Sequence, residues 1–261
     1  MHLEDRSSDL TGKNEASTVL NLSAPMSDRN PKKRLFLFMF ITIYLIVLLI
    51  SGVSVFVIYQ NNVNQTNAHN AYLSSLSGNG TLVFSDPLSQ ENGSQWSAST
   101  GNGGICQFEG NAYHIKQQSD SFLGCKATSG TYGNFAFEVQ LTIIQGGCGG
   151  VSFRDKGNGF FYYFHICQDG SYDITGYANY GGLQHLPYGK SSAFHAGLGQ
   201  QNTIAVKAIG SVMAFYVNEQ HITQAQDDGR YTEGSIGLGA YPPGLDTPTE
   251  VAYTNARLWT L

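Results

Sequence analysis

Residues 148–167 read CGGVSFRDKGNGFFYYFHIC, and two β-rich runs flank the turn-forming segment DKGNG. This pattern is typical of a β-hairpin. With the turn centred near Gly157, Cys148 lies opposite Cys167. We therefore expect a disulfide to join the two strands of this hairpin.

The other two cysteines, Cys106 and Cys125, are assigned to a second disulfide because they remain once the first pair is made. We expect them in a second two-strand segment. The chain has no CxxC pair, which argues against a zinc site. Four buried free thiols are the alternative to two disulfides.

Alternation along the hairpin separates its two faces. The face predicted to be core is made of Val151, Phe153, Phe160, Tyr162, Phe164 and Ile166. The opposite face holds Ser152, Arg154, Phe161, Tyr163, His165 and the disulfide.

The segment Gln168-Asp169-Gly170 fits a three-residue hairpin loop with glycine in the left-handed position. This loop places His165 opposite Asp173 and Phe161 opposite Tyr177. It also places Tyr163 opposite Thr175.

The sequence therefore brings five candidate ligand-binding residues to one surface: Arg154, Tyr163, His165, Asp173 and Tyr177. Aromatic rings beside hydrogen-bonding groups suit a sugar, whose C–H faces stack on rings while its hydroxyls need fixed partners. The alternative is an ordinary solvated sheet face with a cross-strand His/Asp pair. A one-residue slip in the register of the strands would move some of these residues to the opposite face.

Short alternating runs between Gly, Asn and Asp recur over residues 81–261, with no long amphipathic helix among them. Many close-spaced strands indicate an all-β sandwich of two antiparallel sheets. The length suits one domain with a single core. Trp259 lies in an alternating terminal strand and is predicted to be a core residue rather than a stacking platform.

Residues 35–59, LFLFMFITIYLIVLLISGVSVFVIY, carry no charge. As a helix they are long enough to cross a bilayer core of roughly 30 Å. Lys32, Lys33 and Arg34 precede this run, and the next basic residue is Lys116. The positive-inside rule thus predicts a single-pass protein of the cell membrane, with a cytoplasmic N-terminus and an extracellular C-terminal domain. A buried core helix is the alternative.

Two polar segments flank the predicted span. Residues 1–34 are predicted to be a disordered cytoplasmic tail, and residues 60–80 a flexible extracellular linker rich in Asn and Ser. Asn64, Asn79 and Asn92 lie in glycosylation sequons, which are used only in a eukaryotic source.

Five segments together resemble a known family: CQFEGNAYHI, FAFEVQLTII, GVSFRDKGNGFFYYFHICQDGSYDI, TIAVKAIGSVMAFYVNEQHI and GSIGLGAYPPGLDTPTEVAYTNARLWTL. Over residues 81–261 the chain resembles concanavalin A-like jelly-roll domains of the 3-keto-disaccharide hydrolase-like type. Such domains are found behind a single transmembrane helix in bacterial surface proteins, some with a cytoplasmic kinase domain, for which a 34-residue tail is too short. The resemblance implies a two-sheet sandwich with ligands on its concave face or rim.

Among functions, non-catalytic binding of carbohydrate or another surface ligand is the first hypothesis. Glu138 is followed two positions later by Gln140, so the E-x-D-x-x-E motif of jelly-roll glucanases is missing. No catalytic carboxylate pair is evident, and no catalytic residue is assigned. A cell-surface glycoside hydrolase and a structural or adhesive domain are the alternatives.

Charge and short motifs indicate which cofactors and partners to expect. Residues 86–261 hold 8 Lys/Arg against 14 Asp/Glu, which argues against nucleic-acid binding. The segment Asp227-Asp228-Gly229 fits either a structural calcium loop or an exposed turn. No other cofactor is expected, and the expected partners are the lipid bilayer and a glycan or other extracellular ligand.

Overall fold

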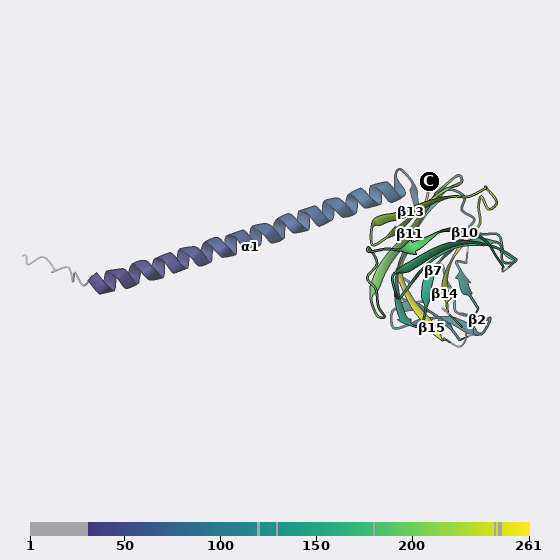
Figure 1. Ribbon diagram of the computed structural model, residues 1–261, viewed down its shortest axis with the longest axis horizontal. Coiled ribbons are helices and arrows are strands. Elements are labelled where there is room, and N and C mark those ends of the chain that lie inside the picture. The colour runs from purple at the N-terminus through teal and green to yellow at the C-terminus, as the bar shows by residue number, and fades with distance from the viewer. Residues whose placement is uncertain (1–30, 119–120, 129, 180, 243, 245–246) are drawn as a thin grey trace, which may run out of the picture. The chain divides into compact units, whose positions relative to one another are not determined.

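A computed structural model describes residues 31–118, 121–128, 130–179, 181–242, 244 and 247–261. It comprises one long helix and fifteen strands (Figure 1). The chain divides into two compact units between Asn61 and Asn62. Most of the predicted cytoplasmic tail, residues 1–30, lies outside the described residues.

Helix α1 spans Pro31–Ser77. Its large apolar side chains from Leu35 to Tyr59 are exposed, and the helix is long and apolar enough to cross a membrane. The tail prediction is wrong for residues 31–34, which form the first turn of α1.

The prediction of a flexible linker over residues 60–80 is also wrong, because α1 continues to Ser77. Tyr72 and Leu76 are four residues apart, and both are buried in a cluster with strand residues of the second unit. This burial outweighs the low helix propensity of Asn and Ser. Gly78 then ends the helix at a positive φ of 54°, and its N–H donates to the Ser74 carbonyl.

Two antiparallel sheets form the β sandwich. The larger sheet runs β13-β12-β11-β6-β15-β4-β3-β2, with β1 also paired to β15, and the smaller runs β10-β9-β8-β7-β14-β5. The strands of the larger sheet are β1 (Thr81–Asp86), β2 (Ser99–Gly101), β3 (Gly104–Glu109), β4 (Ala112–Gln117), β6 (Phe135–Gln145), β11 (Gln201–Ile209), β12 (Val212–Val217), β13 (Gln220–Gln226) and β15 (Thr249–Thr260). Those of the smaller sheet are β5 (Leu123–Lys126), β7 (Cys148–Asp155), β8 (Phe161–Cys167), β9 (Ser171–Ala178), β10 (Gly181–Lys190) and β14 (Ser235–Tyr241). The all-β jelly-roll prediction is confirmed.

The core lies between the sheets and contains five of the six hairpin residues predicted for it: Val151, Phe153, Tyr162, Phe164 and Ile166. Phe160 is the exception and is 37% exposed, because β8 begins only at Phe161. Trp96 is fully buried in the core, where its ring N–H donates to the Cys125 carbonyl at 3.1 Å. Trp259 is buried elsewhere, in the cluster under the end of α1.

Both predicted disulfides are present. Cys148 pairs with Cys167 across β7 and β8, as the hairpin pattern indicates. Cys106 and Cys125 do not belong to one two-strand segment, because β3 lies in the larger sheet and β5 in the smaller. Their disulfide therefore links the two sheets.

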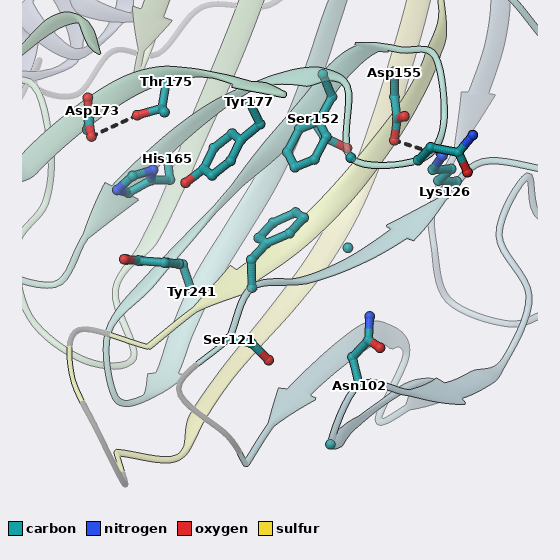
Figure 2. Close-up of a pocket in the computed structure, with 16 residues that line it drawn as sticks. Asn102, Ser121, Lys126, Ser152, Asp155, His165, Asp173, Thr175, Tyr177 and Tyr241 are labelled. Carbon is teal, nitrogen blue, oxygen red and sulfur yellow. Dashed lines mark hydrogen bonds and ion pairs between the residues drawn. The ribbon is translucent and has the colours of Figure 1, made fainter. Parts of the chain in front are cut away.

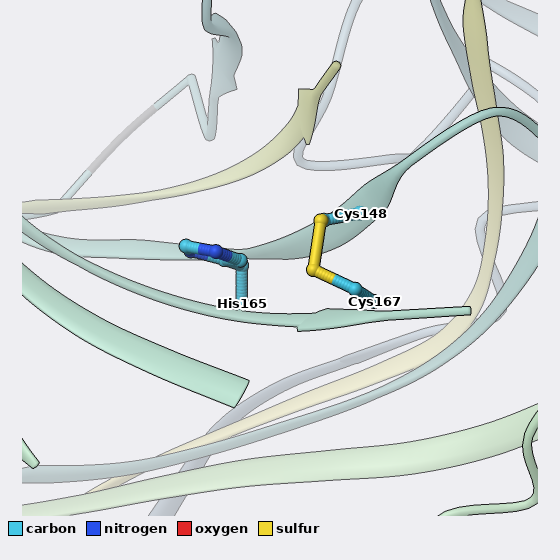
Figure 3. A group of neighbouring side chains, drawn as sticks. All are labelled: Cys148, His165 and Cys167. Carbon is cyan, nitrogen blue, oxygen red and sulfur yellow. A yellow bond between two sulfur atoms is a disulfide. The ribbon is translucent and has the colours of Figure 1, made fainter. Parts of the chain in front are cut away.

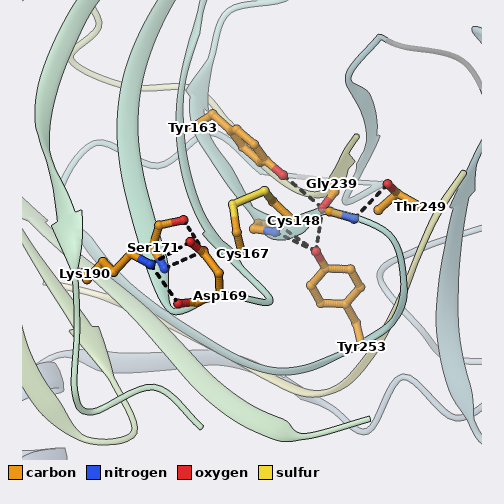
Figure 4. Close-up of a disulfide and its surroundings, with 11 residues drawn as sticks. Cys148, Tyr163, Cys167, Asp169, Ser171, Lys190, Gly239, Thr249 and Tyr253 are labelled. Carbon is orange, nitrogen blue, oxygen red and sulfur yellow. Dashed lines mark hydrogen bonds and ion pairs between the residues drawn. A yellow bond between two sulfur atoms is a disulfide. The ribbon is translucent and has the colours of Figure 1, made fainter. Parts of the chain in front are cut away.

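The loop after β8 also follows its prediction. Gly170 has a φ of 82°, and its N–H donates to the Cys167 carbonyl at 2.9 Å. Asp169 fixes the turn by accepting hydrogen bonds from Ser171 and Lys190 (Figure 4). His165 consequently lies opposite Asp173, and Phe161 opposite Tyr177.

Candidate functional site

The outer face of the six-stranded sheet, opposite the core, is ordered in rows that cross the strands. One row, here named the glycine row, reads from β10 to β5 as Tyr188, Asp173, His165, Gly150, Gly239 and Gly124. The adjacent row reads from β9 to β5 as Thr175, Tyr163, Ser152, Gly237 and Lys126. Half of the glycine row has no side chain, so neighbouring side chains can lie close to the sheet on its β7, β14 and β5 side.

A cleft of about 1080 Å³ lies over this face (Figure 2). Its lining residues are Asn102, Gly103, Ser121, Phe122, Gly124, Lys126, Ser152, Asp155, Asn158, Gly159, Phe161, His165, Asp173, Thr175, Tyr177 and Tyr241. Three of the five residues predicted for the site, His165, Asp173 and Tyr177, are among them. Tyr163 is not, because it is fully buried beneath the cleft and its hydroxyl donates to the Gly239 carbonyl at 3.0 Å.

Aromatic rings form much of the cleft floor. Phe161 and Tyr177 stack nearly parallel, with ring centroids 4.8 Å apart and an interplanar angle of 14°. Phe122 stacks on Phe161 at 5.4 Å and meets the edge of Tyr163 at 4.6 Å. The half-buried rings of Phe122 and Tyr177 offer an apolar platform to a ligand.

Phe122 is a lining residue that the sequence pattern does not reveal, because it precedes β5 in a loop. Two glycines allow its ring to lie against the sheet. A Cβ at Gly124 would lie 2.8 Å from the Phe122 ring, and a Cβ at Gly239 would clash with the same ring. The glycine row thus shapes the aromatic floor.

Polar groups stand at both ends of the cleft (Figure 2). At one end, Lys126 forms an ion pair with Asp155 at 2.9 Å. At the other, the Thr175 hydroxyl donates to Asp173 at 3.0 Å. Burial raises the pKa of the Tyr177 phenol to about 12, so this hydroxyl is neutral near pH 7 and able to donate a hydrogen bond.

His165 lies between Tyr163, at 5.1 Å, and Tyr241, at 5.5 Å between ring centroids. Its ring also lies beside the disulfide (Figure 3), and one ring nitrogen and the two sulfurs lie within 4.8 Å of one another. Because the sulfurs are bonded to each other, they are not free metal ligands. Burial lowers the pKa of His165 to about 4, an effect that the Asp173 charge opposes.

The lowered pKa of His165 predicts that acid destabilises the fold. The unfolded chain binds a proton at His165 near pH 6.5, whereas the folded chain does so only near pH 4. Stability from this residue is therefore complete above pH 6.5 and is lost as the pH falls toward 4. Between pH 7 and 4.5 we expect His165 to account for a loss of about 2 kcal/mol in the free energy of unfolding.

Urea unfolding of wild type and His165→Phe at several pH values measures this contribution. The wild-type stability should fall more steeply than that of the variant between pH 6.5 and 4.5. Parallel pH profiles for the two proteins would show that the neutral imidazole is not favoured by folding.

The prediction that Arg154 belongs to the ligand-binding face is wrong. Arg154 has a φ of 50°, at a β-bulge where two residues of β7 oppose one of β14. The bulge breaks the alternation, and the side chain is buried away from the cleft. There its guanidinium donates to Asp227 at 3.5 Å and to the carbonyls of Tyr231, Gly133 and Gly210.

The same contacts involve the segment Asp227-Asp228-Gly229, which the sequence suggests as a calcium loop or an exposed turn. The Asp227 carboxylate is buried, faces Arg154 and accepts the Gly229 N–H at 2.7 Å. Asp228 is exposed and pairs with Arg230 at 2.8 Å. Both carboxylates therefore already have a cationic partner.

Solved structures share this fold. A carbohydrate-binding module, CBM66, from Bacillus subtilis is similar with a TM-score of 0.52 and 17% identity, over 64% of this chain and 96% of that chain. A galectin-like protein of unknown function from Bacillus subtilis gives a TM-score of 0.54 and 12% identity, over 69% and 96% of the two chains. A structure described as a native glycosidic hydrolase gives 0.51 and 15%, over 67% and 94%.

These similarities establish a jelly-roll fold that carbohydrate-binding and glycosidase domains share, and at this identity they establish the fold alone. No protein-family model matches the sequence, and comparison with curated proteins yields no match. The function of this chain therefore has to be argued from its own cleft.

Proposed function

We propose that this protein is a membrane-anchored, extracellular carbohydrate-binding protein that binds a glycan in the cleft without hydrolysing it. The carrying observation is the aromatic floor, where the half-buried rings of Phe122 and Tyr177 pack on Phe161 between polar groups at the two ends. A sugar stacks its C–H face on such rings while its hydroxyls bind the surrounding polar groups. The jelly-roll fold supports this assignment only as an analogy.

Membrane anchoring forms part of the same proposal. Helix α1 is long and apolar enough to span a bilayer. The basic residues Lys32, Lys33 and Arg34 favour a cytoplasmic N-terminus, which leaves the sandwich outside the cell. Two disulfides suit that oxidising environment. The more specific resemblance to 3-keto-disaccharide hydrolase-like domains of bacterial surface proteins is consistent with this placement.

The positions of the acidic groups favour binding over hydrolysis. Glu138 lies on β6 of the other sheet, where Tyr72 and Arg257 hydrogen-bond to it. Within the cleft, the Asp155 carboxylate pairs with Lys126 and also accepts the Gly157 N–H. A glycosidase needs one carboxylic acid and one carboxylate across the bond that it cleaves. Hydrolysis remains the second candidate because Asp155 and Asp173 both line the cleft.

A glycan array tests the proposal, with the full chain in lipid nanodiscs so that no sugar-based detergent competes. We expect a glycan class to bind and Tyr177→Ala to lower its affinity about tenfold, since a stacked ring contributes about 1.4 kcal/mol. Phe160→Ala is the matched control, because Phe160 is outside the cleft. Binding that both variants retain would contradict the proposed site.

The same sample separates binding from catalysis. Bound glycans are incubated with the protein, and the release of reducing ends is measured for wild type and for Asp155→Asn and Asp173→Asn. The proposal predicts no release by any of them. Release that depends on either carboxylate would establish the hydrolase instead.

A further inference from the structure

A second hollow, of about 490 Å³ and here named the edge hollow, adjoins the cleft at the β9–β10 edge of the sheet. It is lined by His165, Cys167, Ser171, Tyr172, Asp173, Tyr188 and Gly189. His165 and Asp173 line both spaces, so the cleft and the hollow meet at this pair.

Tyr188 gives the edge hollow its own platform. It lies opposite Asp173 on the neighbouring strand, as the first member of the glycine row. Its side chain is 75% exposed. An aromatic ring left this exposed beside a hollow is typical of a binding surface, because its apolar area is available for burial by a ligand.

The two spaces together cross the whole sheet. The cleft reaches from Lys126 on β5 to Asp173 on β9, and the edge hollow continues to Tyr188 on β10. Neighbouring strands are about 4.8 Å apart, so six strands span roughly 24 Å. That length is several times the width of one sugar ring.

The charges along this path favour an uncharged ligand. Lys126 is neutralised by Asp155, and Lys190 pairs with Asp169 at 2.8 Å beside the edge hollow. His165 at the junction is neutral near pH 7, next to the Asp173 carboxylate. An acidic sugar needs a cationic partner, and the two lysines that the structure describes along this path, Lys126 and Lys190, are already paired.

We propose that the cleft and the edge hollow are two subsites of one site, which takes a linear, uncharged oligosaccharide of at least three sugar units. The chain of sugars runs across the strands, with one part on the Phe122 and Tyr177 rings and another on Tyr188. His165 and Asp173 lie under the link between the two parts. This inference rests on the proposed function and specifies the ligand of the same cleft.

Titration calorimetry on the full chain in nanodiscs tests the inference. The probes are malto-, cello-, xylo- and manno-oligosaccharides of one to six units, with oligogalacturonides as the acidic counterpart. For at least one neutral series we expect affinity to rise at least tenfold from one unit to the longest chains. The acidic series should bind at least tenfold more weakly than the best neutral series.

Tyr188→Ala distinguishes the two subsites. We expect it to lower the affinity of the longest chains about tenfold and that of single sugars less than twofold. Because Tyr188 is exposed, we expect the variant to fold as the wild type does, and circular dichroism verifies this. A lower affinity then reports the loss of the ring. Phe160→Ala, which removes a ring outside both spaces, should change neither affinity.

Four results would overturn the inference. Affinity independent of chain length, or an equal loss for short and long chains in Tyr188→Ala, would exclude a second subsite while leaving carbohydrate binding intact. Stronger binding of the acidic series would exclude an uncharged ligand. Absence of binding to every series would overturn this inference, and absence of binding on the glycan array as well would overturn the proposed function.

Discussion

Replacing Arg154 with Met is expected to lower the free energy of unfolding by about 3 to 5 kcal/mol while leaving glycan affinity unchanged. The Arg154 side chain is 1% exposed, and that of its partner Asp227 is fully buried. The substitution leaves the Asp227 charge buried without its cation. It also removes the donor to the carbonyls of Gly133 and Gly210, which lie on separate loops. Urea unfolding measures the loss of stability.

A second variant separates charge from packing. Arg154→Met/Asp227→Asn removes the buried charge but keeps an oxygen that can accept the Gly229 N–H. It should recover part of the stability that Arg154→Met loses. If Arg154→Met instead kept full stability and abolished glycan binding, Arg154 would belong to the site, as the alternation of the hairpin predicts.

Leu76→Ala is expected to cost about 2 to 5 kcal/mol of unfolding free energy, although Leu76 belongs to a segment that reads as a linker. Leu76 is fully buried, in a cluster with Ala136, Ala205 and Trp259. Docking of the helix end is reinforced by polar contacts. The Tyr72 hydroxyl donates to Glu138 at 2.5 Å, and Lys207 donates to the Ser75 carbonyl at 2.6 Å.

The two tryptophans report on this helix separately. Trp259 lies in the cluster under the helix end, whereas Trp96 lies in the main core. In a Trp96→Phe background, fluorescence during urea unfolding follows the surroundings of Trp259. The matched control is Leu73→Ala, which removes the same atoms from a partly buried position and should cost less. Equal, small losses for both variants would mean that the helix end does not stabilise the sandwich.

The sequence predicts the strand register of the site well, because alternation and a three-residue loop determine it. The pairs His165/Asp173 and Phe161/Tyr177 follow from that pattern alone. Arg154 does not follow this alternation, because a bulge with a positive φ reverses the direction of its side chain. A bulge has no signature in the alternation of apolar and polar residues.

Two other features lie outside what the pattern can predict. Phe122 reaches the cleft from a loop, and its position depends on Gly124 and Gly239, which are distant from each other in sequence. The end of α1 reads as a polar linker because Tyr72, Leu73 and Leu76 are the few large apolar residues in a segment rich in Asn and Ser. Their burial becomes evident only when the outer face of the larger sheet is known.

A crystal structure of the unit Asn62–Leu261 with the tightest-binding array glycan would test the location of the site most directly. We predict a sugar ring stacked on Tyr177 over the outer face of the six-stranded sheet, and further units directed toward Tyr188. A glycan bound instead to the outer face of the nine-stranded sheet, or only to loops away from the cleft, would contradict the account.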